Sequence, residues 1–272
     1  MSDPLAAAEP TPVLLVDTPA PGVRRFTLNR PQRRNALNNE LRGALLQALG
    51  DADDDPDVSV AIIRGAGPSF CSGYDLGSDL SDERPYHTAG GPGAWSRHVA
   101  EGWFRIWDLG IPVIASVHGH AMAGGSELAA ACDLVYCATD AIFSYPVTRL
   151  VSPPDFQYHP WLVSLRPAME LVLTGDPISG EEAARIGLVN RAVPPADLES
   201  HTLAIAGRLV GVPRELLQIN KRSVHRALEI MGARTALRSG SELMGLASGL
   251  PATRDALARG SAAVRDAARQ RD

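Results

Sequence analysis

A glycine turn between two apolar stretches is the feature that most constrains the fold of this chain. Residues 111–117 (IPVIASV) are apolar and partly β-branched, which is typical of a buried strand, and residues 127–132 (ELAAAC) have high helix propensity. Residues 118–126 (HGHAMAGGS) join them. A strand that enters a helix through glycines directs unpaired backbone N–H groups, and the positive end of the helix dipole, at the space above the turn. The sequence therefore predicts an anion or oxyanion site here.

A second glycine-containing turn precedes the first one. Residues 58–64 (VSVAIIR) predict a buried strand, and the turn at residues 65–76 follows it. Residues 95–109 then show large side chains at helical spacing. This alternation of strands and helices predicts an α/β core with parallel strands and crossover helices.

The first half of the chain also contains less specific elements. A hairpin is expected around the turn-forming residues 19–22, and a helix with an apolar face is expected to begin near residue 39 and to stop at Gly50. The acidic residues 51–57 are interpreted as a solvated connector. The polar residues 77–93 are interpreted as a mobile loop beside the ligand of the glycine turns.

After Tyr145 the sequence becomes irregular up to residue 166, and helical stretches follow at residues 168–174, 180–186, 195–209 and 213–231 and in the Ala/Arg-rich tail. In the stretch 213–231 one face is apolar. This stripe predicts a core contact or a subunit interface; it consists of Leu217, Val224, Leu228 and Met231.

Composition narrows the class of protein. The chain has 272 residues, 45% of them hydrophobic and 21% charged, and its formal net charge is −5, so no basic excess indicates nucleic-acid binding. The N-terminus has neither the pattern of a signal peptide nor that of a membrane span. The three cysteines, at positions 71, 132 and 137, form no CxxC pair, which argues against structural zinc and for a reducing compartment. We expect a cytoplasmic protein without a bound metal.

Two glycine turns at strand ends can aim two N–H donors at one oxygen, and fixed donors stabilise negative charge that develops during a reaction. Glu127, three residues beyond Gly124, lies near enough to move protons. This combination suggests enolate chemistry on a carbonyl compound. Taken singly, each feature has an ordinary interpretation: a glycine turn is most often a simple connection, and a glutamate early in a helix most often compensates the dipole.

The order and spacing of several motifs resemble those of the crotonase (enoyl-CoA hydratase/isomerase) family. The matching motifs run from about residue 13 to residue 193: NRP at 29–31 with NALN at 35–38, FCSGYDL at 70–76, AGGSELA at 123–129 with CD at 132–133, and LTGDPISGEEA at 173–183 with GLVN at 187–190.

The resemblance implies a fold, a division of the chain and an assembly. The expected fold is α/β, a crotonase-like spiral of ββα units with a C-terminal helical region, usually built into trimers or dimers of trimers. Residues 1–11 are then a flexible tail, residues 12–195 the spiral core, and residues 196–272 a helical oligomerisation region.

The resemblance also implies the site. The oxygen of an acyl-CoA thioester is expected to accept hydrogen bonds from the backbone N–H groups of Tyr74 and Gly124. Coenzyme A enters as part of the substrate, so no further cofactor is expected. Its expected contacts are Arg34, Ala36, Leu37, Ser72, Asp75 and Leu76.

The sequence departs from the family pattern where hydratases carry a second glutamate after a proline, because Val147 occupies that position. By counting, Asp155 falls where dienoyl-CoA isomerases and a chlorobenzoyl-CoA dehalogenase carry a functional aspartate. We hypothesise that Glu127 and Asp155 form the acid/base pair, with Tyr158 or His159 as a helper. The alternative interpretation, of equal weight, is that Asp155 is only a turn residue after two prolines. His118 and His120, beside the glycine turn, are interpreted as packing residues.

The leading functional hypothesis is an enoyl-CoA hydratase that acts on an α,β-unsaturated acyl-CoA through an enolate. The alternatives within the family are an enoyl- or dienoyl-CoA isomerase, a hydrolase or a decarboxylase, and the alternative outside catalysis is an acyl-CoA-binding scaffold. The sequence does not define the acyl group. Four aromatic residues suggest either a bulky apolar pocket or plain core; they are Trp103, Trp107, Phe156 and Trp161.

Overall fold

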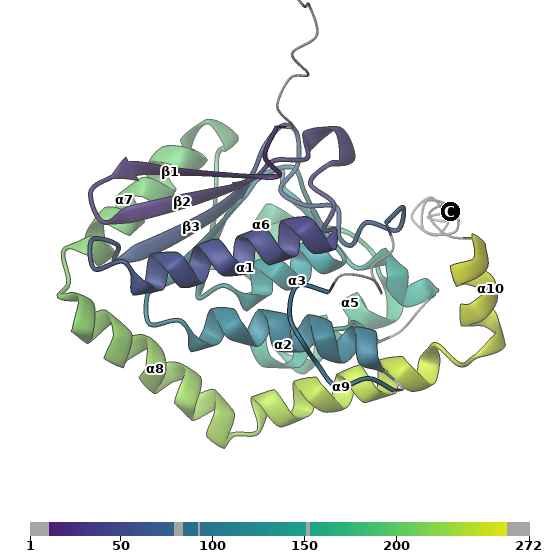
Figure 1. Ribbon diagram of the computed structural model, residues 1–272. Helices are drawn as coiled ribbons and strands as arrows, with labels where there is room; N and C mark the ends of the chain where they lie inside the picture. The colour runs from purple at the N-terminus through teal and green to yellow at the C-terminus, as the bar shows by residue number, and fades with distance from the viewer. Residues whose placement is uncertain (1–10, 79–83, 92, 151–152, 260–272) are drawn as a thin grey trace, which may run out of the picture.

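The computed structural model describes residues 11–78, 84–91, 93–150 and 153–259, which form two sheets flanked by helices (Figure 1). The large sheet has the strand order β1-β2-β3-β4-β6-β9, and the small sheet has the order β5-β7-β8. The strands of the large sheet are β1 Leu14–Ala20, β2 Val23–Leu28, β3 Val60–Gly65, β4 Val113–Val117, β6 Leu134–Ala138 and β9 Arg191–Val193. Those of the small sheet are β5 His120–Met122, β7 Ile142–Ser144 and β8 Ile178–Ser179.

Strand pairing confirms the predicted hairpin and the predicted α/β core. Strand β1 pairs antiparallel with β2, and β2, β3, β4, β6 and β9 then pair in parallel. All residues of β4 are buried. Such strands are apolar throughout because helices cover both faces of a parallel sheet.

Ten α-helices surround the sheets within the described part of the chain. They are α1 Asn39–Asp54, α2 Ala94–Asp108, α3 Gly124–Ala131, α4 His159–Leu162, α5 Leu165–Thr174, α6 Gly180–Arg185, α7 Leu198–Val210, α8 Arg214–Ile230, α9 Ala233–Ala247 and α10 Pro251–Arg259. In this part of the chain, no helix has both the length and the apolar character needed to cross a membrane.

Helix α1 does not stop at Gly50, so that prediction was wrong. The helix continues to Asp54, and the first part of the acidic stretch is therefore helical and not a connector. A glycine within a helix costs only about 1 kcal/mol relative to alanine, and the buried Leu49 and Ala52 on either side hold this part of α1 against the core.

The Asp53 carboxylate in the same turn accepts hydrogen bonds from the backbone N–H groups of Gly110 and Ile111, at 3.0 and 2.8 Å. It thereby joins the end of α1 to the segment that enters β4. A polar residue in the acidic stretch thus positions the strand that leads to the central glycine turn.

The segment expected to be irregular up to residue 166 is partly helical, since it holds a 3-10 turn at Pro146–Arg149 and helix α4. In the expected mobile loop, residues 84–91 carry no helix or strand. Residues 79–83 and 92 of that loop lie outside the described residues, so its mobility stays a prediction.

Helix α7 covers the large sheet, whereas α8 and α9 run along the opposite side of the molecule and α9 packs against α2 (Figure 1). The predicted stripe on α8 is only partly core. Leu217 is buried, but Val224 and Met231 are 62% and 65% exposed. The stripe therefore presents apolar surface to the outside of the single chain.

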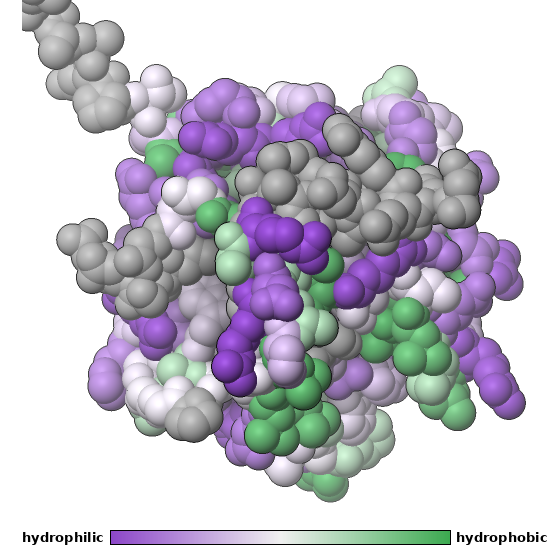
Figure 2. Space-filling model, turned by 90° about the vertical axis from the view of Figure 1, so that its right-hand side faces the viewer, coloured by the Kyte–Doolittle hydropathy of each residue, from purple (hydrophilic) through white to green (hydrophobic). Residues whose placement is uncertain are grey.

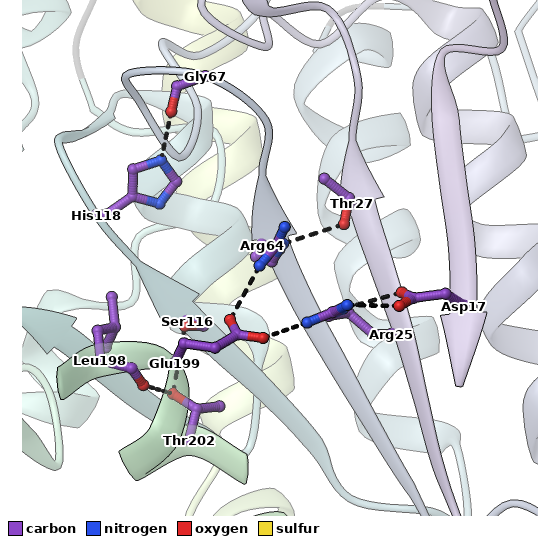
Figure 3. Close-up of polar contacts among 10 residues, drawn as sticks. All are labelled: Asp17, Arg25, Thr27, Arg64, Gly67, Ser116, His118, Leu198, Glu199 and Thr202. Carbon is purple, nitrogen blue, oxygen red and sulfur yellow. Dashed lines mark hydrogen bonds and ion pairs between the residues drawn. The ribbon is translucent and has the colours of Figure 1, made fainter. Parts of the chain in front are cut away.

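Charged side chains fasten α7 to the large sheet (Figure 3). Glu199 on α7 pairs with Arg25 on β2 and, at 2.9 Å, with Arg64 on β3, and Arg25 also pairs with Asp17 on β1. These groups line an open hollow of about 730 Å³. Because its carboxylates and guanidinium groups pair with one another, the charges of this hollow hold α7 against the large sheet.

Candidate active site

The two glycine turns meet, as the sequence analysis requires. Cys71 N donates to His120 O at 2.9 Å and Met122 N donates to Cys71 O at 3.0 Å, so the turn after β3 runs beside β5. A Cβ atom added to Gly73 would lie 3.3 Å from Gly124 N, which shows how closely the two turns approach. The backbone next to Tyr74 therefore adjoins the start of α3.

The residue before Gly124 has a strained backbone. Ala123 has φ 47° and ψ −119°, a conformation that residues with a Cβ rarely adopt. Two hydrogen bonds hold it: Ala123 N donates to Ser144 O at 2.9 Å, and Ala123 O accepts from Glu127 N at 3.0 Å. Such strain persists only where the surroundings impose it. The N–H groups in the first turn of a helix have no intrahelical acceptors. The strained residue before α3 therefore fixes the orientation of the Gly124 N–H, which can donate to a ligand.

The loop expected to contact coenzyme A is held by one buried amide. Arg34 and Asn35 have φ 49° and 56°. The Asn35 side chain donates to Ser69 O at 2.8 Å and accepts from Arg30 N at 2.9 Å. Asparagine tolerates the left-handed conformation well. The result is a fixed loop at residues 30–37.

This loop lies directly against the second expected contact region. Ser72 N donates to Arg34 O at 3.0 Å, and Asp75 N donates to Leu37 O at 3.0 Å. Of the six expected coenzyme A contacts, Leu37 is fully buried, Ala36 is 8% exposed and Leu76 is 46% exposed. The Asp75 carboxylate pairs with Arg30 at 2.8 Å, so its charge stabilises the loop. The structure thus brings the six residues into one region.

A cavity of about 390 Å³ opens beside the two turns. Its walls come from the turn at residues 72–76, from the start of α2, from the segment after β7 and from α9. The residues that matter for chemistry are Tyr74, Ser96, Tyr145, Val147 and Asp155. Val147, at the position of the missing second glutamate, thus gives this wall an apolar side chain. Most of the lining is apolar, as in sites that bind small molecules.

Glu127 lies behind this wall and does not line the cavity. Its side chain is fully buried and receives hydrogen bonds from the Tyr74 hydroxyl at 2.6 Å, the Tyr145 hydroxyl at 3.0 Å and Phe156 N at 3.2 Å. Burial and, second, the charge of Asp155 raise the pKa of the Glu127 carboxyl to about 8. Glu127 is therefore mostly protonated at neutral pH.

Asp155 does reach the cavity although it is only 4% exposed. The Ser96 hydroxyl donates to its Oδ1. Burial raises the pKa of Asp155, while hydrogen bonds from Ser96 and Trp95 and the charge of Arg42 oppose that rise. Two nearby buried carboxyls do not both ionise readily, so ionisation of Asp155 favours the protonated form of Glu127.

Several residues of α2 around the pair were not predicted to contact it, although Trp103 was considered for a pocket or the core. Trp103 Nε1 donates to the Tyr74 hydroxyl at 3.2 Å, and Ser96 and Trp95, which contact Asp155, begin the same helix α2. These residues lie far from both glycine motifs along the chain. Tyr145 was also not predicted as a site residue. It lies two residues before Val147, the position that was compared with the second glutamate of the hydratases.

The suggested helpers occupy a different place. Tyr158 and His159 line a second cavity of about 10 Å³, on the other side of Tyr145, which lines both cavities. The Tyr158 hydroxyl pairs with Ser126 Oγ at 2.5 Å. Burial lowers the pKa of His159 to about 4, so its imidazole is neutral at pH 7. His118 Nε2 lies 2.8 Å from Gly67 O, a contact that stabilises the turn after β3, as a packing residue would.

The four aromatic residues considered for the pocket belong to the core. Trp103 and Phe156 are at most 1% exposed, and Trp107 and Trp161 pack against the core. Trp95, which the sequence analysis did not single out, lines the cavity in their place.

Known proteins resemble this chain over most of its length. The Enoyl-CoA hydratase/isomerase family pattern matches residues 19–245. A putative enoyl-CoA hydratase of Mycobacterium tuberculosis, EchA13, is 33% identical over 234 residues, 79% of this chain and 74% of that protein.

Solved structures give the same result. A probable enoyl-CoA hydratase from Mycobacterium thermoresistibile superposes with a TM-score of 0.79 at 33% identity, covering 87% of this chain and 97% of that one. A monofunctional enoyl-CoA isomerase from Mycobacterium smegmatis superposes with a TM-score of 0.68 at 32% identity, covering 80% and 95%. The crotonase fold expected from the sequence is confirmed, and the chain belongs to the enoyl-CoA hydratase/isomerase family.

Proposed function

We propose that the protein processes acyl-CoA thioesters and acts as an enoyl-CoA hydratase on an α,β-unsaturated acyl-CoA. The observation that carries this proposal is the meeting of the two glycine turns at the rim of a largely apolar cavity that also holds Asp155. Family membership and the relatives named as enoyl-CoA hydratases support it.

In this proposal the thioester oxygen accepts hydrogen bonds from the N–H groups of Tyr74 and Gly124. These donors are fixed before the reaction, and fixed donors stabilise an enolate oxygen without reorganisation. Ionised Asp155 removes a proton from the water that adds to the β carbon. Coenzyme A is bound as part of the substrate along the loops at residues 34–37 and 72–76, and no other cofactor takes part.

A double-bond isomerase is the second candidate, and Val147 is the observation that favours it. Isomerisation moves one proton between two carbons of the same molecule and needs no bound water. The cavity presents Asp155, while the position of the second hydratase glutamate is apolar. One carboxylate that carries a proton from carbon to carbon is sufficient for this reaction.

The experiment that separates these functions is incubation of the purified protein with 2-enoyl-, 3-enoyl- and dienoyl-CoA esters. The absorbance of the reaction mixture and the mass of the products are measured. Hydration removes the conjugated absorbance and adds the mass of one water, whereas isomerisation changes the absorbance at constant mass. Cleavage of the thioester, with release of free coenzyme A, marks a hydrolase. Binding without any turnover across the panel supports the scaffold function and contradicts the enzymatic proposal.

We further propose self-association as a trimer or hexamer in the cytoplasm. Large apolar side chains are exposed on α5, α8 and α9, and Figure 2 shows hydrophobic patches on the face that carries α10. Exposed apolar patches commonly mark protein interfaces. These exposed side chains include Leu165, Leu173, Ile219, Val224, Ile230 and Leu246.

A further inference from the structure

Glu127 is buried outside the cavity in which the substrate is proposed to bind. An acid that moves protons to a substrate must reach the substrate, or reach a group that does. Glu127 is fully buried and absent from the cavity wall, where Tyr74 and Tyr145 stand between its carboxyl and the open space. Each of its oxygens is covered by one phenol: Oε1 by Tyr145 and Oε2 by Tyr74.

The two phenols are not equivalent. The Tyr74 hydroxyl donates to Glu127 at 2.6 Å and accepts from Trp103 Nε1 at 3.2 Å, so indole and carboxyl fix it from two sides. The Tyr145 hydroxyl lies 3.0 Å from Glu127, and its second contact is the longer one of 3.4 Å from Asp155 N. Tyr145 therefore connects the segments of both carboxyls and has the less constrained hydroxyl.

We propose that Tyr145 is a catalytic acid of this site: its hydroxyl gives a proton to the α carbon of the substrate, and Glu127 behind it restores that proton. The proposal rests on the proposed acyl-CoA function. When Glu127 carries the proton of the pair, its hydroxyl donates to the Tyr145 oxygen, and the Tyr145 hydrogen is free to point into the cavity. Glu127 is in this account a positioning and proton-storing residue.

The steps balance for hydration. Asp155 takes a proton from the water as the water oxygen bonds to the β carbon. The enolate electron pair then forms the α C–H bond with the Tyr145 proton, the phenolic O–H bond breaks, and Glu127 passes its proton to the phenolate. The carboxyl pair still holds one proton, now on Asp155. Loss of this proton from Asp155 to water in the cavity, and uptake of a proton by Glu127, reset the site.

The test compares three tyrosine-to-phenylalanine variants, which keep the ring and remove only the hydroxyl. Tyr145→Phe is expected to lower kcat by at least about 100-fold while KM changes by less than about threefold, since a proton transfer and not binding is lost. Tyr74→Phe removes the hydrogen bond to Glu127 and the one from Trp103, and it lowers kcat by about tenfold or less. Tyr136→Phe is the matched control, because Tyr136 is a buried tyrosine on β6 outside the cavity, and it leaves kcat unchanged.

A kcat of Tyr145→Phe within about threefold of wild type overturns the proposal. If that variant does not fold, a crystal structure of the wild-type protein with an unreactive saturated acyl-CoA decides instead. The Tyr145 hydroxyl is then expected to be the acidic group nearest the α carbon, and a Glu127 oxygen in contact with the acyl chain overturns the proposal. If the wild-type protein neither binds nor converts any acyl-CoA, the proposed function itself is contradicted. This result differs from an active Tyr145→Phe variant, which contradicts only the role of Tyr145.

Discussion

The Tyr145 hydroxyl donates to Glu127 Oε1 at 3.0 Å, and the same hydroxyl accepts a hydrogen bond from Asp155 N. One side chain thus contacts the carboxyl buried behind the cavity wall and the backbone of Asp155, whose carboxyl lines the cavity. The charge of Asp155 also raises the pKa of Glu127, so the charge of one acid affects the affinity of the other for its proton.

Asp155→Asn is expected to lower turnover by at least about 100-fold, because an amide cannot accept the proton of the attacking water. The amide keeps the size of the side chain, so acyl-CoA binding measured by calorimetry should persist. Asp57→Asn, at an exposed aspartate, serves as the control. Near wild-type rates for Asp155→Asn would show that Asp155 is only a turn residue.

The pH dependence of kcat should carry the signature of Glu127. Its carboxyl must be protonated to restore the proton of Tyr145, and its pKa is raised to about 8 by burial and by Asp155. Activity is therefore expected to fall as the pH rises through about 8. Hydrogen bonds from Tyr74, Tyr145 and Phe156 oppose this rise in pKa.

Glu127→Gln tests this pH dependence, because its amide cannot ionise. The variant should have a lower kcat and should lack the fall in kcat near pH 8, the basic limb of the pH profile. The same sign applies to stability. A carboxyl whose folded pKa lies above its ordinary value of 4.5 stabilises the fold below pH 4.5, and this contribution is lost as the pH rises through about 8. Denaturant unfolding at several pH values measures the difference between wild type and Glu127→Gln. A basic limb that persists unchanged in Glu127→Gln would assign it to another group.

Two glycine-to-alanine variants separate function from helix propensity. A Cβ on Gly124 would meet the Tyr74 ring at 2.6 Å, so Gly124→Ala should displace that ring and lower kcat. Gly50→Ala is the matched control, because nothing lies within 4 Å of its Cβ position and it is within α1. It should raise the free energy of unfolding by about 0.5–1 kcal/mol at unchanged kcat. Equal kcat values for the two variants would contradict the tight approach of the turns.

The fastening of α7 should contribute little free energy despite its several ion pairs. The Glu199 side chain is 47% exposed, and pairs between exposed charges typically contribute about 0–1 kcal/mol. Glu199→Gln is expected to lower the free energy of unfolding by less than about 1 kcal/mol, and the difference should shrink at high salt. A larger loss that salt does not change would indicate a role beyond these pairs.

The sequence predicted the fold well because local patterns and packing agree along most of the chain. The apolar strands and the amphipathic helices have the periodicities of their elements, and the glycine motifs lie at strand ends where parallel topology brings them together. Gly50 shows the limit of local reasoning, since the buried neighbours Leu49 and Ala52 outweigh the helix-breaking tendency of one residue.

The site was predicted less completely. Glu127 and Asp155 were predicted as the acid/base pair from motif and spacing, and these roles stay predictions. The sequence held no sign that Glu127 would be covered by Tyr74 and Tyr145. That cover arises from tertiary contacts across three separate segments. Likewise, Ser96 and Trp103 reach the site from α2, and no spacing rule relates a helix to turns that precede and follow it.

We propose that the N–H groups of Tyr74 and Gly124 polarise a thioester carbonyl. Isotope-edited infrared difference spectroscopy tests it on the wild-type protein, with a saturated acyl-CoA labelled with ¹³C at the thioester carbon. Two fixed hydrogen bonds weaken the C=O bond, so the carbonyl band is expected to move to lower frequency on binding, and to move less in Gly124→Ala. A bound acyl-CoA whose carbonyl band keeps its frequency in water would contradict the account.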